Sequence, residues 1–105
     1  FELAKQEGRA AGIVSTARIT HATPAATYAK SAERNWENDA QIPAAEKAKG
    51  CKDIAAQMIE WPAGGGFEVM LGGGRANFLP KEKDPKTSGT RKLVAPEFNG
   101  FGYVL

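Results

Sequence analysis

Residues 12–34 read GIVSTARITHATPAATYAKSAER, and their pattern predicts a strand, a polar loop and a helix in that order. Residues 13–16, rich in β-branched side chains, are typical of a buried strand. The pair Thr23-Pro24 favours a helix start, because the fixed φ and missing N–H of proline are tolerated in the first helical turn. We therefore predict a helix from Pro24 to about Ser31. The loop before it holds His21 at the carboxyl end of a strand, where open α/β sheets bind ligands.

The rest of the chain predicts further helices, in residues 1–7 with Gly8 as their stop, in residues 43–48, and from Cys51. Cys51, Ile54, Ala55 and Met58 have the three-four spacing of an amphipathic helix, which Pro62 would end. The polar residues 35–41 predict a loop that Trp36 anchors.

Strands are predicted at residues 67–71 and 103–105. The long connection between the first two strands fits a parallel crossover, so we expect an α/β fold with a largely parallel sheet flanked by helices. Residues 80–92 predict a surface loop, residues 93–98 a short helix remnant and residues 99–100 a turn.

Composition places the chain of 105 residues among globular proteins, with 42% hydrophobic and 25% charged residues. A formal charge of +2 is too small to indicate a nucleic-acid partner. No apolar run has the length that crosses a membrane. Because the first helix lacks an N-cap and the last strand stops abruptly, we expect an internal segment, residues 1–105, truncated at both ends.

Three side chains of the opening stretch could carry chemistry. The guanidinium of Arg34 can bind two phosphate oxygens at once, or it can pair with Glu33 or Glu37 on the surface. Thr23 can cap the helix or offer its oxygen to a hard cation. His21 can be a structural hydrogen-bonding group or lie near a metal. In one unbroken helix, Thr23 and Arg34 would lie about 16 Å apart, so a shared site requires the helix to end early or Arg34 to fold back.

The glycine run 72–74 follows a predicted strand, as phosphate-cradling loops do. It lacks the Gly-Lys-Ser/Thr ending of a P-loop and the spacing of a dinucleotide fingerprint. We therefore interpret it as a structural turn.

Four motifs in order resemble the metal-dependent alkaline phosphatases. They are STARITHATPAA followed by Arg34, GCKDIAAQMIE, VMLGGGR and GTR, and the resemblance extends over essentially the whole chain. It implies a three-layer sandwich whose enzyme hydrolyses phosphate monoesters through a phosphoserine intermediate, with two zinc ions and one magnesium ion.

By this resemblance, Arg34 binds phosphate, Thr23 ligates magnesium, and His21 stands where the family has histidine or aspartate beside the magnesium site. The nucleophilic serine and most zinc ligands would lie outside the chain, so the isolated chain is predicted to be inactive. Cys51 would pair with a cysteine that is also outside the chain, because one cysteine cannot form an internal disulfide.

The resemblance further implies phosphate monoesters and inorganic phosphate as partners. It also implies a homodimeric parent that is periplasmic, secreted, or extracellular and anchored to the membrane. Two alternatives remain open from the residues. One is a small non-catalytic module in which His21, Arg34 and the basic loop hold an anion. The other is a structural protein without a ligand.

Overall fold

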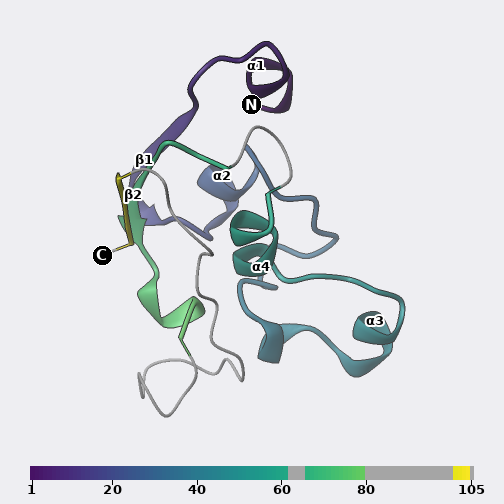
Figure 1. Cartoon of the computed structure of the whole chain (residues 1–105). Coiled ribbons are helices and arrows are strands. Elements are labelled where there is room, and N and C mark those ends of the chain that lie inside the picture. Colours follow the sequence, from purple (N-terminus) through teal and green to yellow (C-terminus); the bar gives the residue numbers. More distant parts are fainter. Residues whose placement is uncertain (62–65, 80–100, 105) are drawn as a thin grey trace.

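The computed structural model describes residues 1–61, 66–79 and the strand 101–104 (Figure 1). In chain order, its elements are α1 (Glu2–Gln6), β1 (Gly12–Arg18), α2 (Ala22–Ala25), the 3-10 turn η1 (Asp39–Gln41), α3 (Ala44–Ala48), α4 (Ile54–Ile59), β2 (Val69–Gly73), the 3-10 turn η2 (Arg75–Asn77) and β3 (Phe101–Val104). The helices predicted in residues 1–7 and 43–48 are thus confirmed, as is a strand near the end of the chain.

The three strands form a parallel sheet in the order β1-β2-β3, with Ile13 opposite Met70 and Met70 opposite Gly102. The predicted parallel α/β arrangement is therefore confirmed. Helices α2 and α4 lie on one side of this sheet (Figure 1). On β1, Ile13 is buried towards the helices, whereas Val14 on the opposite face is 73% exposed. The described residues thus form a sheet with helices on one face.

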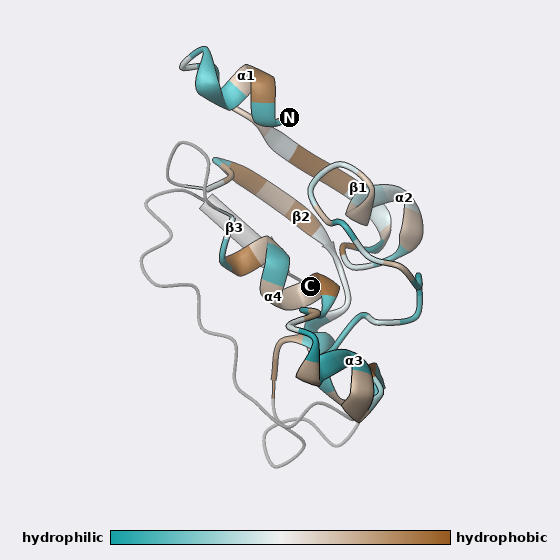
Figure 2. Cartoon of the chain, turned by 90° about the vertical axis from the view of Figure 1, so that its right-hand side faces the viewer, coloured by the Kyte–Doolittle hydropathy of each residue, from teal (hydrophilic) through white to brown (hydrophobic). Residues whose placement is uncertain are grey.

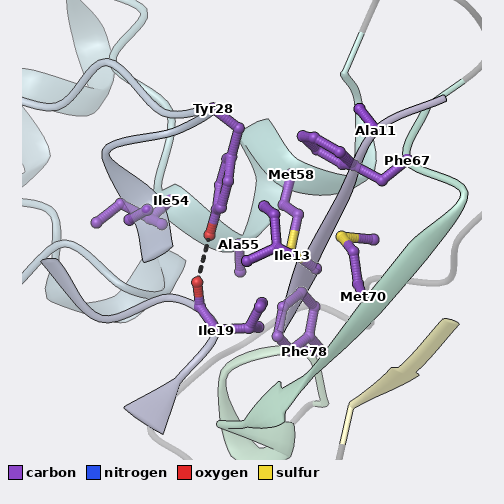
Figure 3. Close-up of a cluster of buried hydrophobic side chains, with 11 residues drawn as sticks. Ala11, Ile13, Ile19, Tyr28, Ile54, Ala55, Met58, Phe67, Met70 and Phe78 are labelled. Carbon is purple, nitrogen blue, oxygen red and sulfur yellow. Dashed lines mark hydrogen bonds between the residues drawn. The ribbon is translucent and has the colours of Figure 1, made fainter. Parts of the chain in front are cut away.

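The hydrophobic core lies between the strands and α4 (Figure 3). Ile13 and Met70 come from the sheet, and Ile54 and Met58 come from α4. Figure 2 shows the hydrophobic stretches along β1 and β2. The buried Tyr28 donates its hydroxyl hydrogen to the backbone oxygen of Ile19 at 2.9 Å. Burial, and then the nearby negative charge of Glu37, raise the pKa of Tyr28, so the phenol stays protonated.

The predicted helix from Pro24 to Ser31 is wrong at both ends. α2 begins at Ala22, because His21 takes extended angles and its carbonyl accepts from the amide of Ala25 at 2.9 Å. The chain leaves the helical path by Lys30, whose backbone N–H and C=O both bond the side-chain amide of Gln57 on α4, at 2.8 and 3.0 Å. The helix therefore ends early, which was the condition for bringing Arg34 near its start.

Cys51 does not lie on a helical face, because α4 begins only after it. The carboxylate of Asp53 accepts from the amide of Ala56 at 3.1 Å and caps the helix start. Cys51 is half-buried and has no disulfide partner among the described residues. Its pairing with a cysteine outside the chain stays a prediction.

The second strand lies two residues later than predicted, and two glycines of the supposed turn belong to it. A Cβ at Gly72 would lie 3.2 Å from the backbone oxygen of Ala17 and 3.3 Å from Cβ of Ile19. Glycine at this position lets β1 approach closely, and a Cβ would press on its neighbours there. Gly74 follows with a φ of +96° and makes the turn.

Some predictions fall on residues outside those that the structure describes. These are the helix stop at Pro62, the loop over residues 80–92, the helix remnant at 93–98 and the turn at 99–100.

Candidate functional site

The site begins where β1 ends. Ile19 continues the pairing, with its amide donating to the backbone oxygen of Gly73 at 2.9 Å, and it is fully buried. The chain then turns, because the amide of His21 donates to the carbonyl of Arg18 at 2.9 Å. This turn places His21 at the N-terminal end of α2 and at the carboxyl end of a parallel strand.

The segment 33–41 lies beside this turn and is held by the start of α4. The amide of Ile54 donates to the carbonyl of Trp36 at 2.8 Å, and the amide of Ala55 donates to the carbonyl of Glu37 at 3.2 Å. These bonds satisfy amides that have no acceptor within the helix. The predicted loop in residues 35–41 is confirmed up to η1, which forms its end. Anchoring by the Trp36 side chain stays a prediction, because the contact to α4 is made by the Trp36 backbone.

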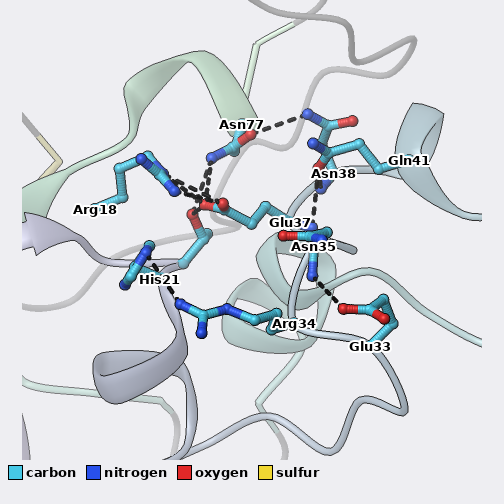
Figure 4. A network of polar contacts seen from close by, with 10 residues as sticks. Arg18, His21, Glu33, Arg34, Asn35, Glu37, Asn38, Gln41 and Asn77 are labelled. Carbon is cyan, nitrogen blue, oxygen red and sulfur yellow. Dashed lines mark hydrogen bonds and ion pairs between the residues drawn. The ribbon is translucent and has the colours of Figure 1, made fainter.

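The side chain of Glu37 joins this loop to two other segments. Its carboxylate accepts from Nε of Arg18 at 2.9 Å, from Nη2 of Arg18 at 2.8 Å and from Oγ1 of Thr20 at 2.6 Å. It also accepts from Nδ2 of Asn77 in η2 at 3.1 Å. We call Arg18, Thr20, Glu37 and Asn77 the Glu37 cluster (Figure 4). The cluster fixes β1, the loop and η2 to one another.

The charge of Glu37 is stabilised although its side chain is only 10% exposed. Burial alone would raise the pKa of this carboxyl group. The hydrogen bonds from Arg18 and Thr20, together with the positive charge of Arg18, outweigh burial and hold the pKa below its ordinary value of 4.5. The same contact raises the pKa of Arg18. Glu37 is therefore an ionised carboxylate at neutral pH.

Arg34 and His21 come together at the edge of this cluster. Nη2 of Arg34 lies 3.4 Å from Nε2 of His21, and the Arg34 side chain is exposed (Figure 4). Arg34 donates in this contact, since a guanidinium has no acceptor. The alternative pairing of Arg34 with Glu33 or Glu37 does not occur among the described residues, because Arg18 holds Glu37. The exposed guanidinium can therefore receive an anion from solvent.

Thr23 lies inside the first turn of α2 and is exposed, so the predicted capping role is wrong and His21 takes the N-cap position. Its hydroxyl is a hard oxygen donor that suits magnesium as one ligand among several. Within residues 1–61 and 66–79, no three His, Cys, Asp or Glu side chains gather closely enough to hold a metal ion. These residues fit a contribution to a magnesium site and do not form a zinc site.

A hollow of about 650 Å³ lies away from these residues, between the turn after α2 and the end of α4. Tyr28, Lys30, Gln57 and Trp61 are among its lining residues, and His21, Thr23 and Arg34 are not. Its size does not make it the site, because the side chains with phosphate- and cation-binding chemistry gather at the carboxyl end of β1.

The sequence analysis missed Arg18, Thr20 and Asn77, and it considered Glu37 only as a surface partner of Arg34. One signal was available. Thr20 follows directly on the buried Ile19 at the end of a strand, and a polar side chain there needs a buried partner.

The described residues form a parallel α/β sheet with an exposed arginine beside the carboxyl end of a strand, which is the edge at which open α/β sheets bind ligands. The family model described as alkaline phosphatase matches residues 1–95. The chain belongs to the alkaline phosphatase family.

Curated relatives agree with this assignment. A membrane-bound alkaline phosphatase of Bombyx mori is 48% identical over 93 residues, which cover 88% of this chain and 17% of the relative. The tissue-nonspecific isozyme of Gallus gallus is 51% identical over 78 residues, covering 74% of this chain and 15% of the relative. The Homo sapiens isozyme is 43% identical over 95 residues, covering 84% and 18%. The chain thus spans 15–18% of the length of these relatives.

None of the described helices is long and apolar enough to cross a lipid bilayer.

Proposed function

We propose that this chain is a segment of an alkaline phosphatase and that Arg34 binds the phosphate group of the substrate. The observation that carries the proposal is the exposed guanidinium of Arg34, held 3.4 Å from His21 at the carboxyl end of β1. A planar guanidinium bonds two phosphate oxygens and offsets the charge of the transferring phosphoryl group. Membership of the family and the ligand-binding position of this edge support the same role.

In this proposal, the complete enzyme hydrolyses phosphate monoesters through a phosphoserine intermediate and uses two zinc ions and one magnesium ion. The serine and most zinc ligands lie outside residues 1–105, so the isolated chain has no turnover. The sheet is part of a three-layer sandwich, and the parent is a homodimer outside the cytoplasm. The membrane-bound relative of Bombyx mori supports this location.

Thr23 would offer its hydroxyl oxygen to magnesium. His21 would lie beside that site and affect the metal through the groups that bind it, without binding the metal itself. Magnesium, when bound, offsets negative charge at the reacting phosphate. The part of this chain is to present one oxygen from a helix start and to place an arginine next to it. The exposure of Thr23 is what makes its oxygen available.

The test uses the complete product of the open reading frame that encodes this chain, assayed with p-nitrophenyl phosphate in zinc and magnesium. Arg34→Ala should lower kcat/KM by about 10²-fold and weaken inhibition by inorganic phosphate, because a charged donor to the transferring group is lost. Arg9→Ala is the matched control, since Arg9 is also exposed but precedes the amino end of β1. It should leave both quantities unchanged.

Equal kinetics in the Arg34→Ala and unmutated proteins would contradict the assignment of Arg34. Phosphate binding that depends on Arg34, without any turnover by the complete product, would instead favour the non-catalytic anion-binding module.

A further inference from the structure

The backbone of its loop, and not the contacts of its own side chain, determines where the guanidinium of Arg34 lies. Its one hydrogen-bonded neighbour among the described residues is His21, at 3.4 Å, and both lie at the protein surface. A long and exposed side chain retains many rotamers. The position of its guanidinium therefore depends on where the backbone of residues 33–38 is held.

Two attachments hold that backbone. The first is the start of α4, which donates to the carbonyls of Trp36 and Glu37. The second is the side chain of Glu37, three residues after Arg34, which reaches the end of β1 and η2. The first attachment ties the loop to a helix beneath it. The second ties it to the strand end that carries His21.

We propose that Glu37 is the positioning residue for Arg34, holding its loop beside His21 so that the guanidinium meets phosphate in one geometry. This inference rests on the proposed function, because it acts through the phosphate-binding role of Arg34. Glu37 does not touch the substrate. Its effect on catalysis passes through the placement of the neighbouring arginine.

A carboxylate is required by the donors that surround it. Arg18 directs two N–H groups at the Glu37 oxygens, Thr20 directs a hydroxyl and Asn77 directs an amide N–H. A glutamine offers one acceptor oxygen and turns N–H groups towards the remaining donors. A glutamine side chain of the same size would therefore hold the loop less firmly than the glutamate does.

The cluster also keeps Glu37 away from Arg34. Its carboxylate is bound by Arg18, with which it forms an ion pair at 2.8 Å. Because this pairing satisfies the carboxylate, the arginine beside His21 stays available to an external anion. Glu37 thus sets both the position and the availability of Arg34.

The experiment is a double-mutant cycle in the complete gene product, with KM, kcat and inhibition by inorganic phosphate as readouts. Glu37→Gln should raise the inhibition constant for phosphate by about 10-fold in the unmutated background and by less than about 2-fold in the Arg34→Ala background. Glu33→Gln is the matched control. It removes the same charge from the same loop, outside the Glu37 cluster, and should change the constant by less than about 2-fold.

A role confined to stability would lower the unfolding temperature and change phosphate inhibition equally in both backgrounds, and that result would overturn the inference. If Glu37→Gln does not fold, Thr20→Val replaces it, because this change keeps the side-chain shape and removes the hydroxyl that donates to Glu37 and accepts from Nδ2 of Asn77. The same dependence on Arg34 is expected.

The outcomes separate the two proposals. If Arg34→Ala alone leaves phosphate inhibition unchanged, the proposed function fails and the inference fails with it. If Arg34→Ala weakens inhibition while Glu37→Gln and Thr20→Val do not, only the inference is overturned.

Discussion

Two glutamates bind the opposite ends of the paired strands β1 and β2, and they do so differently. Glu68 lies before β2, accepts from the amide of Ala11 at 2.6 Å and pairs with the buried Lys5. Its side chain is 45% exposed, against 10% for Glu37 at the carboxyl ends. Both carboxyl groups have a lowered pKa.

The two glutamates differ in whether water can replace a lost hydrogen-bond partner of the carboxylate. If a contact to Glu68 is lost, solvent can satisfy the exposed carboxylate. Water does not reach Glu37 in this way, so protein donors from two segments, the end of β1 and η2, must surround its oxygens. The buried glutamate therefore fixes the relative positions of those segments, and it is the one that lies near Arg34 and His21.

Glu37→Ala should be the most destabilising change at either end. Thr20 and Asn77 would lose a buried acceptor, although Arg18 is half exposed and can turn to water. We expect the free energy of unfolding of the complete gene product to fall by about 2–3 kcal/mol. Denaturant unfolding measures it. Glu33→Ala, the control in the same loop, should change it by less than about 0.5 kcal/mol, and an equal loss in both variants would contradict the comparison.

Gly72→Ala tests the strand pairing that lies next to the Glu37 cluster. The added Cβ would press on the carbonyl of Ala17 and on Ile19, so we expect a loss of about 1–2 kcal/mol. Gly73→Ala is the control, because its Cβ would find its nearest neighbour at an ordinary 3.7 Å. Thermal unfolding of the two variants should therefore differ. Equal midpoints would show that β1 can move away at no cost.

Glu68→Gln should have the smallest effect on stability. The pH dependence of this effect separates the contribution of the Glu68 charge from that of its packing. The amide of Ala11 and then the ion pair with Lys5 hold the pKa of Glu68 below its ordinary value of 4.5. A carboxyl group whose pKa is lowered by folding adds stability above its unfolded pKa and loses it as the pH falls through the folded value. The unmutated protein should therefore unfold at a higher temperature than Glu68→Gln at neutral pH. The gap should close in acid well below pH 4.5. A gap that persists there would mean that packing, and not charge, is lost in the variant.

The sequence predicted those parts of the fold that local patterns determine. β1, α1 and α3 lie where their residues indicated, and the parallel sheet followed from the long connection between strands. The limits of α2 and α4 were wrong because side-chain bonds to the backbone decide them. Gln57 of α4 bonds the backbone of Lys30 after α2, and Asp53 caps the start of α4 so that Cys51 lies before the helix.

The site was predictable to a similar extent. The motif singled out His21 and Arg34, and the requirement that the helix end early was met. The Glu37 cluster was not foreseen, because its donors lie 17 to 40 residues from Glu37 and only the folded sheet brings them together. Hydrogen bonds of this kind leave no periodic signal in a sequence.

The bond between Glu37 and Asn77 also sets the order in which the site can form. Asn77 follows Glu37 by 40 residues, so a growing chain must extend past η2 before the cluster can close. Contacts between residues so far apart pay the entropy of closing a long loop before they gain any stability. The strand end and α2 can form from neighbouring residues much sooner. The bond to Asn77 is thus the last of the Glu37 side-chain bonds that a growing chain can form.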